Sequence, residues 1–148
     1  MSDNNNDQVM EMPKKPNDKL RKLAERMTGK WQVKGPEIDD SIEYELTEGG
    51  FFLMQHVDFV QGGTKIKGIE YIAYDQDTDT LRSHYMDTMS SNFTYTWALT
   101  GKTLRINFGD KDSDMYFEGT FSDDNSEYSG AWHYPDGGGY DATVRRVR

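Results

Sequence analysis

The stretch Met27-Thr28-Gly29-Lys30-Trp31-Gln32-Val33 lies where a short helical pattern gives way to a long run of strand-like segments. Before it, apolar residues recur at i, i+3, i+4 and i+7, which places them on one face of a helix. We therefore predict a helix over Lys19–Met27, with Asn17 or Asp18 as its N-cap. The apolar stripe consists of Leu20, Leu23, Ala24 and Met27.

After the stretch, about ten strand-like segments alternate with turn sequences rich in Gly, Asp and Ser. Each short loop makes the next strand antiparallel to the last. We predict an all-β fold, an antiparallel up-and-down β-barrel of about ten strands with one short N-terminal helix, because closure removes exposed strand edges. A two-sheet sandwich is the alternative. The predicted strands are Lys30–Gly35, Ser41–Thr47, Phe51–Val60, Lys65–Tyr74, Thr80–Thr88, Asn92–Leu99, Thr103–Phe108, Met115–Phe121, Tyr128–Tyr134 and Tyr140–Val147.

The composition is that of one acidic domain. The chain has 148 residues and a net charge of −9, with positive residues clustered only at 14–30 and 145–148. Nucleic-acid binding needs clustered positive charge on the body of a domain, so that class is excluded. The absence of cysteine excludes disulfides, zinc–thiolate sites and cysteine nucleophiles. No export signal and no apolar run of membrane length occur, so we expect a cytoplasmic protein that does not bind membranes.

The N-terminal residues have a different composition from the rest of the chain. Residues 1–16 are rich in Asn, Asp and Pro and have no apolar period. We predict a disordered tail over 1–16 and the barrel domain over 17–148.

Strict alternation in the second half of the chain identifies an inward face that is rich in aromatic residues. Gly119 and Gly130 share that face, where they leave space or let a strand bend. An aromatic lumen with gaps can hold an apolar or planar ligand, and a filled core is the alternative. Over residues 41–60 either face could be buried, so no register is predicted there. The inward rows are Phe93, Tyr95, Trp97, Leu99; Leu104, Ile106, Phe108; Met115, Phe117, Gly119, Phe121; Tyr128, Gly130, Trp132, Tyr134; and Tyr140, Ala142, Val144, Arg146.

Asp87 is the candidate functional carboxylate. It shares a face with Tyr85 and Met89, and a carboxylate that faces an aromatic lumen is unfavourable unless it is hydrogen-bonded. It could orient a ligand hydroxyl or amine, or act as a base with a raised pKa. The alternative is a structural carboxylate bonded to loop amides or to an arginine.

No metal site is predicted. His56, His84 and His133 are scattered and lack the spacing of metal ligands. Alternation points His84 away from the face of Asp87. The acidic segments 75–79 and 110–114 lack the Gly and distant Glu of a calcium-binding EF-hand, so we interpret them as solvated hairpin tips.

Gly29-Lys30-Trp31 after a short helix resembles the Gly-x-Trp signature of the calycin group, which includes lipocalins and fatty-acid-binding proteins. In those folds the Trp packs across the closed end of the barrel and an Arg of the last strand lies over its indole. The resemblance implies that Trp31 and Arg146 close this barrel, with Arg145 as the alternative to Arg146.

A second resemblance covers about residues 20–148. Gly68-Ile-Glu-Tyr-Ile-Ala-Tyr74-Asp75, followed by His84-Tyr85-Met86-Asp87-Thr88-Met89, is similar to a bacterial calycin-like family with Gly-Tyr-Asp in one strand and Trp-x-Asp-Ser-Met in the next. The chain departs at Ala73, Tyr85 and Thr88. This resemblance implies a fold and a pocket, and no activity.

Haem is a minority hypothesis. Nitrobindin-like barrels share the Gly-x-Trp signature and use a His of the last strand as axial ligand, whereas that strand here offers Tyr140 and no His. The departure argues against haem, although Tyr can ligate ferric haem. We otherwise expect no cofactor.

Three functional hypotheses follow. The leading one is an intracellular barrel that binds a small apolar or aromatic molecule, such as a lipid, in an aromatic lumen. The second is an acid–base enzyme, an isomerase or hydrolase, that uses Asp87 with His84 or a Tyr. The third is a pocketless structural or interaction barrel, for which a homodimer through Phe51–Val60 is one arrangement. The residues predicted to bind the ligand are Tyr85, Asp87, Tyr95, Trp97, Phe117 and Trp132.

Overall fold

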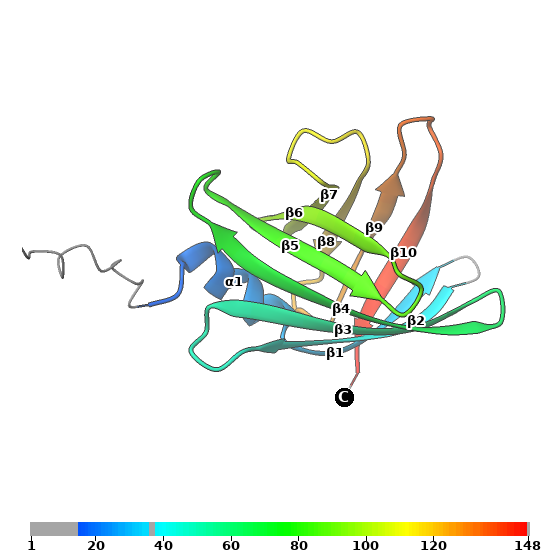
Figure 1. The fold of residues 1–148 in the computed structure, drawn as a ribbon, viewed down its shortest axis with the longest axis horizontal. Coiled ribbons are helices and arrows are strands. Elements are labelled where there is room, and N and C mark those ends of the chain that lie inside the picture. The colour runs from blue at the N-terminus through cyan, green and yellow to red at the C-terminus, as the bar shows by residue number, and fades with distance from the viewer. Residues whose placement is uncertain (1–14, 36–37, 148) are drawn as a thin grey trace, which may run out of the picture.

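A computed structural model of the chain describes residues 15–35 and 38–147, in which one helix precedes ten strands (Figure 1). Residues 1–14, which make up most of the predicted tail, lie outside the described residues. The elements are α1 Asp18–Met27, β1 Gly29–Gly35, β2 Ile38–Leu46, β3 Phe52–Gln61, β4 Thr64–Asp75, β5 Thr80–Asp87, β6 Asn92–Thr100, β7 Thr103–Phe108, β8 Tyr116–Phe121, β9 Glu127–His133 and β10 Gly139–Arg146.

The strands form a closed antiparallel barrel. Each strand pairs with the strands before and after it, and β1 pairs with β10 to close the ring. The predicted up-and-down barrel is therefore confirmed, and the sandwich is excluded. The predicted strand bounds differ from the observed ones by at most one residue, except that β2 begins at Ile38 instead of Ser41.

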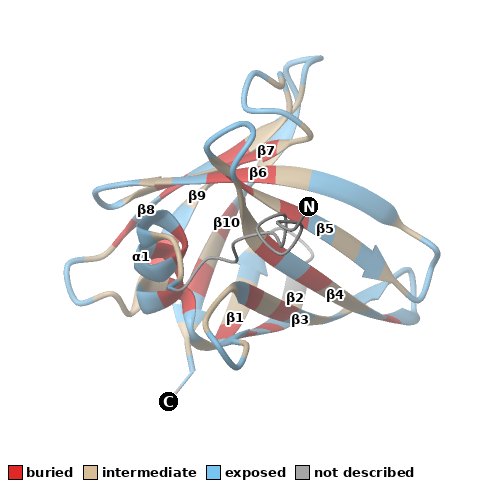
Figure 2. Ribbon diagram, turned by 60° about the vertical axis from the view of Figure 1, so that its left-hand side comes forward, coloured by how far each residue is buried: buried red, intermediate tan, exposed pale blue. Residues whose placement is uncertain are grey.

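Helix α1 lies against one end of the barrel. Its N-cap is Asn17, whose side chain accepts a hydrogen bond of 2.8 Å from the backbone N–H of Lys19. The apolar stripe faces the barrel, where Leu23 and Met27 have no exposed surface. Figure 2 shows buried residues on one side of the helix and at alternate positions of the strands. The described part of the chain contains no helix long and apolar enough to span a membrane.

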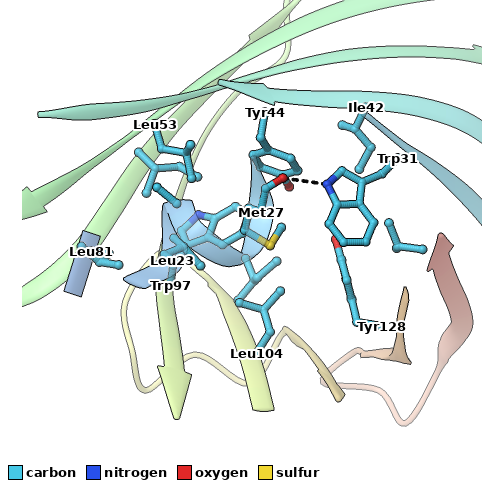
Figure 3. Close-up of a cluster of buried hydrophobic side chains, with 14 of the residues drawn as sticks. Leu23, Met27, Trp31, Ile42, Tyr44, Leu53, Leu81, Trp97, Leu104 and Tyr128 are labelled. Atoms are coloured by element: carbon cyan, nitrogen blue, oxygen red, sulfur yellow. Dashed lines mark hydrogen bonds between the residues drawn. The ribbon is translucent and has the colours of Figure 1, made fainter. Parts of the chain in front are cut away.

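The apolar core lies between α1 and the barrel interior (Figure 3). Leu53, Ile72, Leu81 and Leu104 are each at most 2% exposed and come from four different strands. None of these four side chains is among the described residues that line the barrel cavity.

The structure resolves the register that the sequence left open over residues 41–60. Ile42 and Tyr44 face inward on β2, and Leu53 and Gln55 face inward on β3. Phe52, which alternates with them, is 47% exposed. The inward row of β3 contains a glutamine, and for that reason hydrophobicity alone does not identify it.

Candidate functional site

The barrel contains a cavity of about 410 Å³. All ten strands contribute to its lining, and the turn after β5 adds two residues. The volume falls in the range of small-molecule sites, which is roughly 300–1,000 Å³. All six residues that the sequence predicts for ligand binding line it: Tyr85, Asp87, Tyr95, Trp97, Phe117 and Trp132.

Aromatic rings make up much of the cavity wall. Trp132 lies between Tyr95 and Phe117, with ring centroids 6.4 and 5.8 Å away, and Tyr44 meets Trp97 edge-on at 6.4 Å. Edge-to-face contacts of this kind fix the rings relative to one another. The wall is therefore preformed. The aromatic residues of the lining are Tyr44, Phe59, Tyr85, Phe93, Tyr95, Trp97, Phe117, Tyr128, Trp132 and Tyr140.

The predicted gaps at the inward glycines are largely filled. A Cβ on Gly119 would lie 2.8 Å from the ring of Phe117, so that ring occupies the space beside the glycine. A Cβ on Gly130 would lie 1.9 Å from the backbone oxygen of Glu118. The two glycines pair directly across β8 and β9, and they allow close packing of these strands.

A buried polar network crosses the wall formed by β3, β4, β5 and β6. The amide of Gln55 donates to one carboxylate oxygen of Glu70 at 2.8 Å, and the hydroxyl of Ser83 donates to the other. The indole of Trp97 donates in turn to the Ser83 hydroxyl at 2.9 Å. No fully buried polar side-chain atom in the described part of the chain lacks a hydrogen-bond partner, and the bonds to both Glu70 oxygens make a buried carboxylate tolerable in an apolar wall.

Glu70 is the charged group at the centre of this network. It lines the cavity and is only 5% exposed. Desolvation by burial raises its pKa from 4.5 to about 7, although the polar groups of Ser83, Trp97 and Gln55 favour the charged form and oppose the shift. Glu70 therefore titrates near neutral pH.

Asp87 is held by the turn that follows β5. One of its oxygens accepts hydrogen bonds from the backbone N–H groups of Met89, at 2.8 Å, and Ser91, at 3.1 Å. The other accepts from the hydroxyl of Tyr85 at 2.8 Å. Burial opposes ionisation of Asp87, but these hydrogen bonds outweigh it and lower its pKa. The predicted role as a base with a raised pKa is thus not supported, and the contacts are those of the structural alternative.

Trp31 and Arg146 lie together at the helix end of the barrel. The Arg146 guanidinium stacks 4.1 Å from the indole centroid, and the indole N–H donates to the backbone oxygen of Met27 at 2.7 Å. Arg146 also donates to the backbone oxygens of Arg26, at 2.8 Å, and Thr28, at 2.7 Å. Arg145 instead points outward and pairs with Glu127 at 3.2 Å. This geometry matches the arrangement that the calycin resemblance implies.

The histidines lie outside the cavity. His56, His84 and His133 are exposed, and none of them is among the lining residues that the structure describes. Within residues 15–35 and 38–147, no group of three or more His, Cys, Asp or Glu side chains is placed to hold a metal ion.

The described lining of the cavity offers haem few partners. Its candidate axial ligand is Tyr140, on β10. No Lys, Arg or His is found among the described lining residues to pair with propionates.

Glu70 is the cavity residue that sequence reasoning missed. It lies inside the quoted segment Gly68–Asp75, between Gly68 and Ile72 on one face of β4. Alternation with the buried Ile72 is the signal that places its side chain inward. Tyr85, which the sequence predicts to line the lumen, lies directly opposite Glu70 when β4 and β5 pair as a hairpin. This pairing also places the Glu70 side chain inward.

Comparisons with known proteins identify no family. No protein-family model and no curated protein matches the sequence. A solved structure described as a redesigned beta barrel aligns with 84% of this chain and 95% of its own, at 14% sequence identity and a TM-score of 0.44. The resemblances to the calycin group and to the bacterial calycin-like family stay predictions.

Proposed function

We propose that this protein binds a small apolar or aromatic molecule inside the barrel. The observation that carries the proposal is the cavity of about 410 Å³ lined mainly by aromatic and aliphatic side chains. Transfer of apolar ligand surface into such a wall contributes roughly 25 cal/mol per Å² buried. A few polar groups, above all Glu70, would fix the orientation of the ligand.

The two other hypotheses have less support. A pocketless barrel does not account for the cavity, and β3 lies between β2 and β4, so a homodimer through Phe51–Val60 would have to use outer side chains. An acid–base enzyme would have to use Glu70, because Asp87 has a lowered pKa and His84 points outward.

Ligand binding in the lumen is tested with N-phenylnaphthylamine, a neutral apolar probe whose emission rises in an apolar site. The variant Ala142→Phe places a ring in the cavity from β10, where Ala142 is 6% exposed and lines the wall. The control Ala98→Phe adds the same ring at an exposed position of β6. We expect binding of one probe per chain, weakened by about tenfold or more in Ala142→Phe and by less than about twofold in Ala98→Phe.

Circular dichroism and urea unfolding are used to check that both variants keep the native fold. Failure of the wild-type protein to bind the probe contradicts the proposal. Equal affinity of the wild-type and Ala142→Phe proteins contradicts it as well, since the probe would then bind outside the lumen.

A further inference from the structure

The charged residues in the described lining of the cavity are all acidic. Among its described lining residues the charged types are Asp40, Glu70 and Asp87, and none is Lys, Arg or His. A ligand carboxylate or phosphate would enter this lumen without a cation to pair with it. Because removal of an anion from water is unfavourable unless it is paired, the lining disfavours anionic ligands.

Glu70 is the deepest and most enclosed of these carboxylates. An ionised carboxylate has about four acceptor sites, and the structure fills two of those on Glu70, with Gln55 and Ser83. Asp87, in contrast, accepts three hydrogen bonds from its own strand and turn. Glu70 therefore keeps more acceptor capacity for a donor that enters the cavity.

Aromatic rings from neighbouring strands surround Glu70. Tyr85 lies directly opposite Glu70 in the pairing of β4 with β5. Tyr44 and Tyr95 lie opposite Gln55 and Ser83, the two residues that donate to Glu70. The faces of tyrosine and tryptophan rings attract cations, and this attraction is stronger in a site without water. A carboxylate within an aromatic enclosure is a suitable environment for a buried organic cation.

We propose that the cavity selects ligands in which an apolar or aromatic body carries a protonated amine, with the ammonium group donating to Glu70. This inference rests on the proposed function and names its ligand class. It predicts an order of affinity for matched ligands: amine above alcohol, and alcohol above carboxylate.

The pairing depends on pH through Glu70. The titratable groups that face it are Tyr44 from β2, Tyr85 from β5 and Tyr95 from β6, and burial raises the pKa of each of these phenols, so all stay neutral near pH 7. Gln55, Ser83 and Trp97 do not titrate. The free Glu70 has a pKa of about 7, so affinity for an amine rises as the pH increases through that value.

The experiment compares naphthylmethylamine, naphthylmethanol and naphthoic acid, which share one aromatic body and differ in charge. Isothermal titration calorimetry gives their affinities at about pH 8, where Glu70 is ionised and the amine is protonated. We expect the amine to bind about tenfold more tightly than the alcohol, and the acid more weakly than both. At about pH 6 the amine should lose about tenfold in affinity, while the alcohol changes by less than about twofold.

The variant Glu70→Gln keeps the shape of the side chain and removes its charge. It should remove the advantage of the amine over the alcohol and abolish the pH dependence of amine binding. The control Glu43→Gln removes a glutamate from the exposed face of β2, beside the inward Tyr44, and should leave all three affinities unchanged.

The outcomes separate this inference from the proposed function. Binding of the alcohol without a preference for the amine, or a preference that survives Glu70→Gln, overturns the inference and leaves the proposed function standing. Absence of binding by all three ligands and by N-phenylnaphthylamine overturns both. The comparison of wild-type protein at the two pH values decides the matter even where a variant does not fold.

Discussion

Glu70 combines an apolar surrounding with one hydrogen bond to each of its carboxylate oxygens. Only 5% of the residue is exposed, and its carboxylate is held by side chains from β3 and β5. The folded protein stabilises the protonated form more than water does, because desolvation outweighs the hydrogen bonds and raises the pKa from 4.5 to about 7. Folding at neutral pH therefore carries an energetic cost at this one residue.

The sign of the resulting pH dependence follows from proton binding. Between about pH 4.5 and pH 7 the folded chain binds more protons at Glu70 than the unfolded chain does, so its contribution to the unfolding free energy falls as the pH rises. The contribution is fully present below the unfolded pKa, and the loss is complete above the folded pKa. The size of the loss is on the order of 3 kcal/mol.

We predict that Glu70→Gln stabilises the protein relative to wild type at about pH 8 and has little effect near pH 4.5. Gln cannot ionise, so the variant avoids the desolvated charge at high pH. Urea unfolding of both proteins across this pH range gives the difference in unfolding free energy, in which the titration of all other groups cancels. A difference that does not change with pH would show that Glu70 is not desolvated.

At the scale of elements, strands β8 and β9 pack closely around one pair of glycines. Gly119 lies directly opposite Gly130, and a Cβ on Gly130 would meet the backbone oxygen of Glu118 at 1.9 Å. A backbone atom cannot move aside as a flexible side chain does. Any side chain at position 130 must therefore push the two strands apart.

We predict that Gly130→Ala lowers the unfolding free energy by at least about 2 kcal/mol. The control Gly138→Ala lies in the turn between β9 and β10, where the added Cβ would come within 3.1 Å of the Asp136 carboxylate alone. It should change stability by less than about 0.5 kcal/mol. Chemical denaturation measures both, and similar values for the two variants would contradict this account of the strand packing.

The elements themselves could be predicted from the sequence to within a residue or so. Turn residues separate the strands, and the spacing of Leu20, Leu23 and Met27 defines α1. Which face of β3 points into the barrel could not be predicted, because the inward row includes Gln55. This side chain is stabilised there by its hydrogen bond to Glu70 on the next strand. A contact between strands decided that register, and local hydrophobicity contains no information about it.

At the scale of the whole molecule, Arg146 connects segments that are far apart in the chain. Its guanidinium lies over Trp31 and donates to the backbone oxygens of Arg26 and Thr28, at the C-terminal end of α1. It also donates to the backbone oxygen of Asn125, at 3.3 Å, in the turn before β9. Closure of the barrel by β1 and β10 thus coincides with attachment of the helix.

We predict that Arg146→Lys destabilises the protein by about 2 kcal/mol, because an ammonium cannot reproduce the planar stack and the forked hydrogen bonds. The neighbouring Arg145→Lys should cost less than about 0.5 kcal/mol, since Arg145 makes an exposed ion pair with Glu127. Thermal and urea unfolding of both variants measure the difference. Equal stability of the two variants would contradict a closing role for Arg146.

The closed barrel could be predicted from the whole sequence, whereas the polar network in the cavity wall could not. The aromatic lining follows from alternation along β6, β8 and β9, one strand at a time. The network around Glu70 involves residues of four strands, and its components Gln55 and Ser83 have no distinctive sequence pattern. Alternation combined with hairpin pairing places Glu70 inward, but its hydrogen bonds appear only in three dimensions.

The chain of hydrogen bonds from Trp97 through Ser83 to Glu70 has an optical consequence. The indole N–H of Trp97 is one hydroxyl away from the carboxylate, so a change of charge on Glu70 alters the electric field across the chromophore. The fluorescence maximum of Trp97 is therefore tied to the ionisation of Glu70 and to any cation that binds there. Trp31, stacked under Arg146, donates to the backbone oxygen of Met27 and is not part of this chain of hydrogen bonds. The barrel thus contains its own spectroscopic reporter of lumen charge, without an added dye.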